Sequence, residues 1–138
     1  MRQIKFRAWD KKYKEMINDI HIAPEYDWLV LSDNDALAER DNRGRGDDDG
    51  YELMQFTGIL DKNGKEIYEG DVVEYKAYNT WHKDAVRFTD GKFHGNLSGV
   101  KEDLQSNYDL GLIVTLGCEV IGNIYENPEL LNKNFKQI

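Results

Sequence analysis

The sequence predicts a mainly β protein, and three observations carry this prediction. Apolar residues alternate with polar ones in several short stretches, glycine-bearing turn signals separate these stretches, and β-branched or aromatic residues occur within them. Together they favour short antiparallel strands in a small SH3-like or partly open barrel, either all-β or β-rich α+β, with one or two short helices.

The N-terminal segment predicts a hairpin. Apolar residues occupy alternate positions of Ile4–Ala8, a polar turn follows at Asp10–Lys12, and Met16–Ile22 forms the return strand, which Pro24 ends. The next apolar run, Tyr26–Ser32, is too short to be assigned to a helix or a strand.

An acidic segment then separates two parts of the chain. Between Ser32 and Glu52 lie eight acidic residues and three arginines, which contribute −5 to the net charge of −8. Asp33–Arg40 could form two helical turns, whereas Asp41–Gly50 has no apolar residue and is expected to be a loop or flexible tether. We therefore expect an N-terminal strand group (1–32), an acidic loop (33–50) and a main β unit (51–138), together forming one domain.

The main unit begins with a strand at Tyr51–Gly58 and a turn at Asp61–Gly64. Either Asn63 and Gly64 form the centre of a type I′ turn, or Gly64 takes the left-handed position of a slightly longer loop. Glu69–Asp71 is a second reversal, so the whole stretch is predicted to be a corner that sets strand register.

Further elements are predicted in the rest of the chain. Asp90 and Gly91 predict a two-residue hairpin turn, and Val100–Asn107 a short helix. A strand is expected at Leu112–Leu116 and a closing helical turn beginning at Pro128. The strands that would form the barrel are 72–78, 84–89, 92–97 and 119–125.

Composition limits the possible functions. The single cysteine, Cys118, permits no intrachain disulfide, and neither a signal peptide nor an apolar run of membrane-spanning length is apparent. These features favour a cytoplasmic protein without a membrane partner. The pI of about 4.9 disfavours nucleic-acid binding through phosphate neutralisation.

Three separate blocks of sequence are similar to one known family. "IKFRAWD" at the N-terminus, "LMQFTGILDKNGKEIYEGDVV" in the middle and "EVIGNIYENPELL" near the end resemble the YopX family of phage and prophage proteins. The resemblance extends over nearly the whole chain, except the acidic stretch and residues 78–112. It implies a small, mainly β, phage-encoded protein and supplies no catalytic residues.

No metal, cofactor or catalytic site is predicted. Asp41–Glu52 imitates a calcium-binding loop, but Arg43 and Arg45 stand where oxygen ligands are needed. The histidines His21, His82 and His94 lack zinc-site spacing, and a buried structural role is favoured for Cys118.

One segment, Tyr75–Lys83, combines aromatic and basic residues and is the candidate binding site. Its aromatic residues could stack nucleic-acid bases beside lysines, could hold a peptide, or could simply cover the core or an oligomer interface. The candidate binding residues are Tyr75, Lys76, Tyr78, Trp81 and Lys83.

The functional expectation follows from these points. We expect a non-enzymatic phage or prophage accessory protein that acts through contacts with a protein partner or through self-association. The alternative is a nucleic-acid-binding module built on a small β barrel. The sequence identifies neither the partner nor the oligomeric state.

Overall fold

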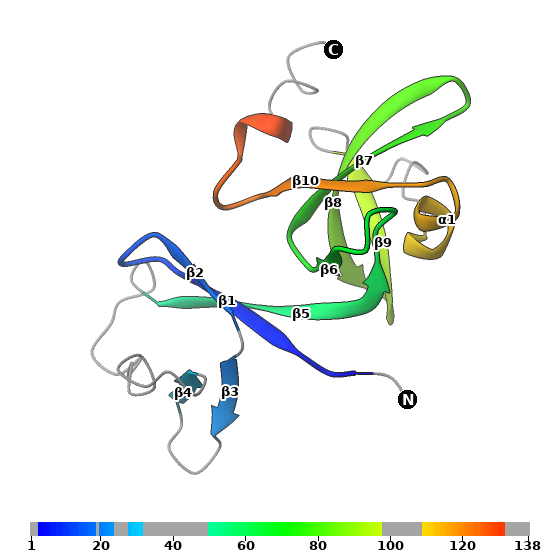
Figure 1. Ribbon diagram of the computed structural model, residues 1–138. Coiled ribbons are helices and arrows are strands. Elements are labelled where there is room, and N and C mark those ends of the chain that lie inside the picture. The colour runs from blue at the N-terminus through cyan, green and yellow to red at the C-terminus, as the bar shows by residue number, and fades with distance from the viewer. Residues whose placement is uncertain (1–2, 19, 24–27, 32–49, 98–108, 132–138) are drawn as a thin grey trace. The chain divides into compact units, whose positions relative to one another are not determined.

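The structure is a computed structural model that describes residues 3–18, 20–23, 28–31, 50–97 and 109–131. Within these residues the chain forms ten strands and one α-helix (Figure 1). The elements are β1 (Phe6–Asp10), β2 (Glu15–Ile17), β3 (Ile20–Ala23), β4 (Trp28–Leu31), β5 (Tyr51–Leu60), β6 (Glu66–Tyr68), β7 (Asp71–Ala77), β8 (Thr80–Thr89), β9 (Lys92–Leu97), α1 (Leu110–Thr115) and β10 (Glu119–Asn123).

The strands confirm the mainly β prediction. Two four-stranded sheets have the orders β2-β1-β5-β6 and β10-β7-β8-β9, and β3 and β4 form a separate pair. One of the four-stranded sheets is curled into a half-barrel. The contacts within the chain divide it into two units, Met1–Phe56 and Thr57–Ile138, and strand β5 crosses the boundary between them.

The first unit contains the predicted N-terminal hairpin. Strand β1 pairs with β2 and β5, and the buried Asp10 carboxylate accepts hydrogen bonds from the backbone N–H groups of Lys12 and Tyr13 in the turn. A small core forms around Ala8, Ile17 and Ile20.

The expected single return strand, Met16–Ile22, is wrong. The chain forms β2, which pairs with β1, and then β3, which pairs with β4. Alternating apolar residues predict an extended backbone, but they do not predict which strand will pair with it. The sequence pattern therefore gave no sign that residues 15–17 and residues 20–23 pair with different strands. The apolar run Tyr26–Ser32, which the sequence does not assign to a helix or a strand, contains strand β4.

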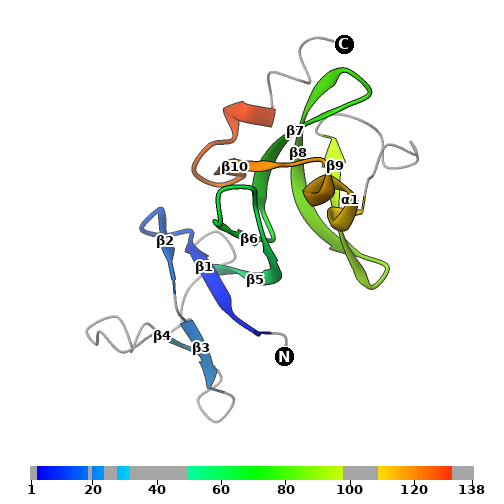
Figure 2. The ribbon, with the colours of Figure 1, turned by 45° about the vertical axis from the view of Figure 1, so that its right-hand side comes forward.

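The second unit is organised around the sheet β10-β7-β8-β9 (Figures 1 and 2). All three pairings are antiparallel, and a cluster of apolar residues lies on each face of the sheet. The larger core contains Ile67, Val73, Tyr75, Ala77, Val86, Leu110, Ile113, Cys118 and Val120. A smaller one on the other face contains Val72, Ala85 and Leu131.

The corner that was predicted at Asp61–Asp71 is confirmed, and Asp61 organises it. Gly64 has φ +84°, so the turn is the longer loop with a left-handed glycine and not the type I′ alternative. One oxygen of the buried Asp61 carboxylate accepts hydrogen bonds from the backbone N–H groups of Asn63 and Lys65, and the other accepts one from Val120. The turn is thereby fixed to strand β10.

These contacts also set the ionisation of Asp61. Burial by itself would raise the pKa of this carboxyl, but hydrogen bonds from the three backbone N–H groups, with the charge of Lys65, leave its pKa below 3.8. The ionised form is therefore the one that the native turn stabilises.

The predicted strand at Leu112–Leu116 is wrong, because this segment lies largely in helix α1. Ile113, Val114 and Thr115 favour extended backbone, but a short apolar run can equally form a buried helix. In the structure Leu110 and Ile113 lie in the core while Leu112 and Leu116 are exposed, which is helical spacing. Packing of these two core residues outweighed local propensity.

The remaining expected elements divide into two groups. The Asp90–Gly91 turn is confirmed by positive φ values at both residues, and a helical turn follows Pro128 at residues 129–131. The expected helices at Asp33–Arg40 and Val100–Asn107 lie outside the described residues, and so does the acidic loop except for Gly50.

Replacing Gly64 by alanine should destabilise the protein by about 1–2 kcal/mol, because an L-residue disfavours φ +84°. Nothing lies within 4 Å of the added Cβ atom, so the effect isolates backbone strain. The matched control is Gly111→Ala in helix α1, where the Cβ atom also meets nothing and helix propensity predicts a gain of roughly 0.5–1 kcal/mol. Urea denaturation of both variants tests this, and equal stabilities would contradict it.

Replacing Asp61 by asparagine should destabilise the protein by about 1–3 kcal/mol near pH 7. Both oxygens of the Asp61 carboxylate accept backbone N–H groups, whereas asparagine has a single acceptor oxygen, so at least one of these N–H groups loses its acceptor. Wild-type stability should also fall as the pH drops below about 4, where the unfolded-state carboxyl becomes protonated, and this component should be missing in the variant. The control is Asp90→Asn, at an exposed turn position that tolerates asparagine. Urea denaturation as a function of pH measures both effects.

Candidate functional site

The candidate binding residues all lie on the β7–β8 hairpin. Its two-residue turn consists of Tyr78 and Asn79, with φ values of +53° and +63°, as a type I′ turn requires. Asparagine and glycine are favoured at such positions, whereas a bulky residue with positive φ is a conformational outlier. Tyr78 is also 87% exposed, so neither local conformation nor core packing accounts for a tyrosine there.

Tyr75 lies in the core and is unavailable to a surface ligand. Its side chain is fully buried, its hydroxyl group donates a hydrogen bond to Asp84 Oδ2 at 2.5 Å, and its ring stacks on His82 with a centroid separation of 5.2 Å. The expectation that Tyr75 contributes to a binding surface therefore fails, because strand alternation turns it toward the core.

The two lysines and the tryptophan share the opposite face of the hairpin. Lys76 pairs with Trp81 and Lys83 pairs with Glu74, and residues opposite one another in a pair of strands lie on the same face. Trp81 is 62% exposed. The carboxylate on Glu74 offsets part of the positive charge that Lys76 and Lys83 bring to this face.

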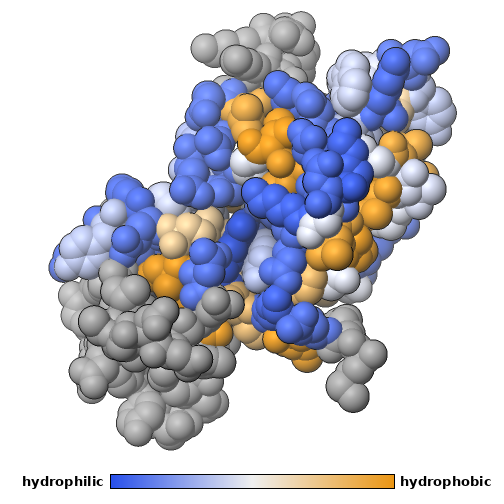
Figure 3. All heavy atoms as spheres, viewed as in Figure 1, coloured by the Kyte–Doolittle hydropathy of each residue, from blue (hydrophilic) through white to orange (hydrophobic). Residues whose placement is uncertain are grey.

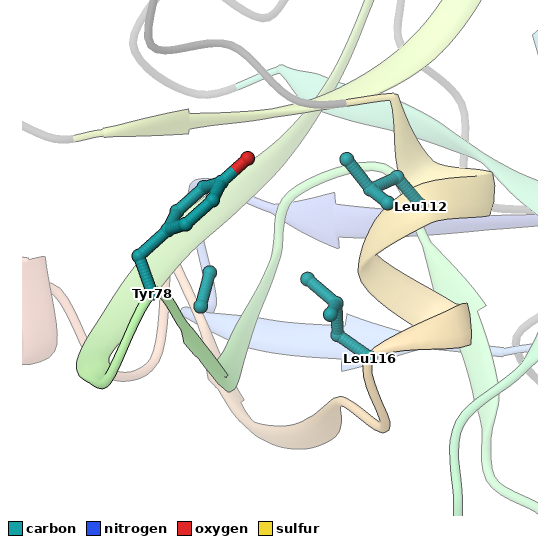
Figure 4. A pocket seen from close by; sticks show the side chains of 4 residues that line it. Tyr78, Leu112 and Leu116 are labelled. Carbon is teal, nitrogen blue, oxygen red and sulfur yellow. The ribbon is translucent and has the colours of Figure 1, made fainter.

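Tyr78 faces a different neighbour, the helix α1. Ala77, Tyr78, Leu112 and Leu116 line a hollow of about 150 Å³, which we call the turn–helix groove (Figure 4). Leu112 and Leu116 are 46% and 41% exposed, and Figure 3 shows hydrophobic side chains gathering beside α1. The structure thus brings one predicted residue together with two leucines that the sequence reasoning had placed in a strand.

The sequence did not predict Leu112 and Leu116 as site residues, because the segment was expected to be a strand, with a period of two, and not a helix. The spacing of Leu112 and Leu116 by four residues was the available signal, since residues at i and i+4 lie on one face of a helix. Nothing in the sequence indicated that this face would lie beside the β7–β8 turn.

Ionisable groups of the described residues do not form a metal site: no three histidine, cysteine, aspartate or glutamate side chains converge there. Burial, followed by the charge of Asp61, raises the pKa of the Cys118 thiol to about 11, so the thiol is neutral near pH 7. His94 is buried, with one ring nitrogen at hydrogen-bonding distance from Thr89 Oγ1 and the other from the Gly95 carbonyl oxygen.

The family comparison agrees with the architecture. The profile of the family described as YopX protein matches residues 5–132 of the 138. The chain belongs to the YopX family.

Individual relatives support this assignment. The YopX-family chain is 36% identical over 73 residues to the "SPbeta prophage-derived uncharacterized protein YopX" of Bacillus subtilis (strain 168). The match covers 49% of this chain and 52% of the relative, so it spans about half the length of that curated protein.

Solved structures extend the likeness to the whole fold. The crystal structure of protein EF1440 from Enterococcus faecalis matches with a TM-score of 0.66 and 30% identity, covering 95% of this chain and 99% of that one. The crystal structure of YopX from B. subtilis matches with a TM-score of 0.58 and 24% identity over the same shares of both chains, which shows the fold alone. Across the described residues of the YopX-family protein, no helix is long and apolar enough to span a membrane.

Proposed function

We propose that this YopX-family protein is a prophage-encoded, non-enzymatic accessory protein that binds a protein partner in the host cytoplasm through the turn–helix groove. The observation that carries the proposal is Tyr78, a bulky aromatic residue held at φ +53° in an exposed turn beside two exposed leucines. Residues held in sparsely populated backbone conformations are concentrated at functional sites. The prophage origin named for the B. subtilis relative supports the genomic setting.

The chemistry of the groove favours a protein ligand. Its lining is apolar apart from the tyrosine hydroxyl group, and exposed tyrosine beside aliphatic side chains is typical of protein-interaction surfaces. The hollow is lined by four residues, so it accommodates a side chain of a partner better than it forms a complete interface between two copies of this chain, which takes roughly 20–30 residues a side.

Replacing Tyr78 by asparagine should separate stability from binding. Asparagine tolerates the left-handed conformation, so the variant should be more stable than wild type by about 0.5–1 kcal/mol. It should nevertheless lose the partner that the wild-type protein retains in a pull-down from the bacterial host, because the ring that lines the groove is gone. The pull-down and urea denaturation together measure the two effects.

The control is Tyr13→Asn, an exposed tyrosine on the other unit that lacks positive φ. This variant should retain the partner. If Tyr78→Asn bound as wild type does, or if wild type retained no partner and light scattering showed a monomer, the proposal would be refuted.

A second candidate function, binding of single-stranded nucleic acid, is favoured by the pairing of Lys76 with the exposed Trp81. A base could stack on the indole ring while Lys76 and Lys83 contact phosphates. The acidic pI of about 4.9 and the adjacent Glu74 oppose it.

If nucleic acid is the ligand, labelled single-stranded DNA should bind at low salt with an affinity that falls steeply as salt increases. Trp81→Ala should then weaken binding by roughly 1–3 kcal/mol, whereas Tyr78→Asn should leave it unchanged. Fluorescence anisotropy measures both variants, and an absence of binding at low salt excludes this function.

A further inference from the structure

One carboxyl group in the core of the second unit has no role in the turn–helix groove. Asp84 on β8 is fully buried, and its Oδ2 atom accepts the hydrogen bond from the Tyr75 hydroxyl group. Its Oδ1 atom is buried without a hydrogen-bond partner in the described structure. A buried oxygen atom without a hydrogen-bond partner destabilises the packing around it, most strongly when the carboxyl group is ionised.

The layer over this carboxyl is packed too tightly for another side chain. Strand β9 contributes Gly95, where a Cβ atom would lie 2.5 Å from Asp84 Oδ2 and 2.6 Å from Ile113 Cδ1. Ile113 belongs to α1 and is fully buried. The carboxyl of β8, the glycine of β9 and the isoleucine of α1 are therefore in one close-packed stack.

Among the described residues, two titratable side chains act on the Asp84 carboxyl. Tyr75 on β7 supplies the hydroxyl group, and His82 on β8 has a weaker effect through its charge. Helix α1, with the sequence LGLIVT, has no ionisable side chain. In the same core, the Cys118 thiol is neutral near pH 7 because its pKa is raised to about 11.

The other charged residues that the structure describes on β8 and β9 lie on the other face of the sheet. Lys83 and Arg87 alternate with Asp84 and Val86 along β8. His94 pairs with Arg87, so it shares that other face, where it contacts Thr89.

We propose that Asp84 is a proton-controlled latch: its neutral carboxyl lets α1 and β9 close over β8, and its ionisation loosens them. The geometry places the carboxyl directly beneath both elements, with no room for a solvating side chain. The inference concerns the chain alone and does not depend on whether the turn–helix groove binds a partner.

The direction of the effect follows from the ionisation of Asp84. Burial raises the pKa of this carboxyl from 3.8 to about 6, although the hydrogen bond from Tyr75 and the charge of His82 act in the opposite sense. In an opened state, where water reaches the carboxyl, the pKa returns toward 3.8. The closed state thus binds the proton more tightly, so closure is favoured below pH 3.8 and weakens as the pH rises through about 6.

Amide hydrogen exchange tests the latch without any ligand. Between about pH 5 and about pH 7.5, the difference between these two pKa values predicts an opening equilibrium for α1 and β9 that increases about tenfold, after correction for intrinsic exchange. Asp84→Asn keeps an acceptor for the Tyr75 hydroxyl group but cannot ionise, so its exchange in α1 should not change over this range. Val73 in the centre of the sheet should stay protected in both proteins.

A second variant keeps the test decisive if Asp84→Asn fails to fold. Tyr75→Phe removes the hydrogen bond that stabilises the ionised carboxyl, so the loosening should move to higher pH than in wild type. Equal pH responses of wild type and Asp84→Asn would overturn the proposal. So would a tenfold change that affects Val73 as much as Ile113, since it would report global unfolding, or an unshifted response in Tyr75→Phe.

Discussion

The Asp61 carboxylate ties the corner of the second unit to strand β10. It binds three backbone N–H groups, two in the adjacent turn and one on β10, 59 residues later in the sequence. A carboxylate that accepts several N–H donors stays ionised when buried, which is why its pKa falls in spite of desolvation. Local turn geometry and the placement of a distant strand are therefore set by one residue.

The same interaction protects an edge of the sheet. Strand β10 lies at the end of the order β10-β7-β8-β9, and unpaired N–H groups of an edge strand are available for pairing with another chain. Asp61 occupies the N–H group of Val120, and Asn127 Oδ1 accepts the hydrogen bond from Asn123 N–H. Pairing of another chain along this edge is thereby discouraged.

Tyr78 and Asp84 are residues that selection for stability alone would not favour. One lies at the turn–helix groove and the other is the proposed proton-controlled latch. Tyr78 holds an aromatic ring in water at a backbone conformation that suits asparagine, and Asp84 keeps a carboxyl in an apolar core. Natural sequences are mostly consistent between local preference and tertiary environment, and exceptions concentrate where a protein acts. Helix α1 and the residue that caps its C-terminus contribute to both places, with Leu112 and Leu116 at the groove and Ile113 above the carboxyl.

The sequence by itself determined the β character, the turns at Gly64 and Asp90–Gly91 and the resemblance to the YopX family, because these depend on local backbone preference and residue order. Only the tertiary structure decided that Leu112–Thr115 is helical, that Tyr75 is buried and that Tyr78 lies beside Leu112 and Leu116. Each of these outcomes depends on contacts between residues distant in the sequence. For the helix, burial of Leu110 and Ile113 outweighs the modest preference of β-branched residues for strands. Alternation indicates that neighbouring residues face opposite sides of a strand, but which side becomes the core depends on what packs against it.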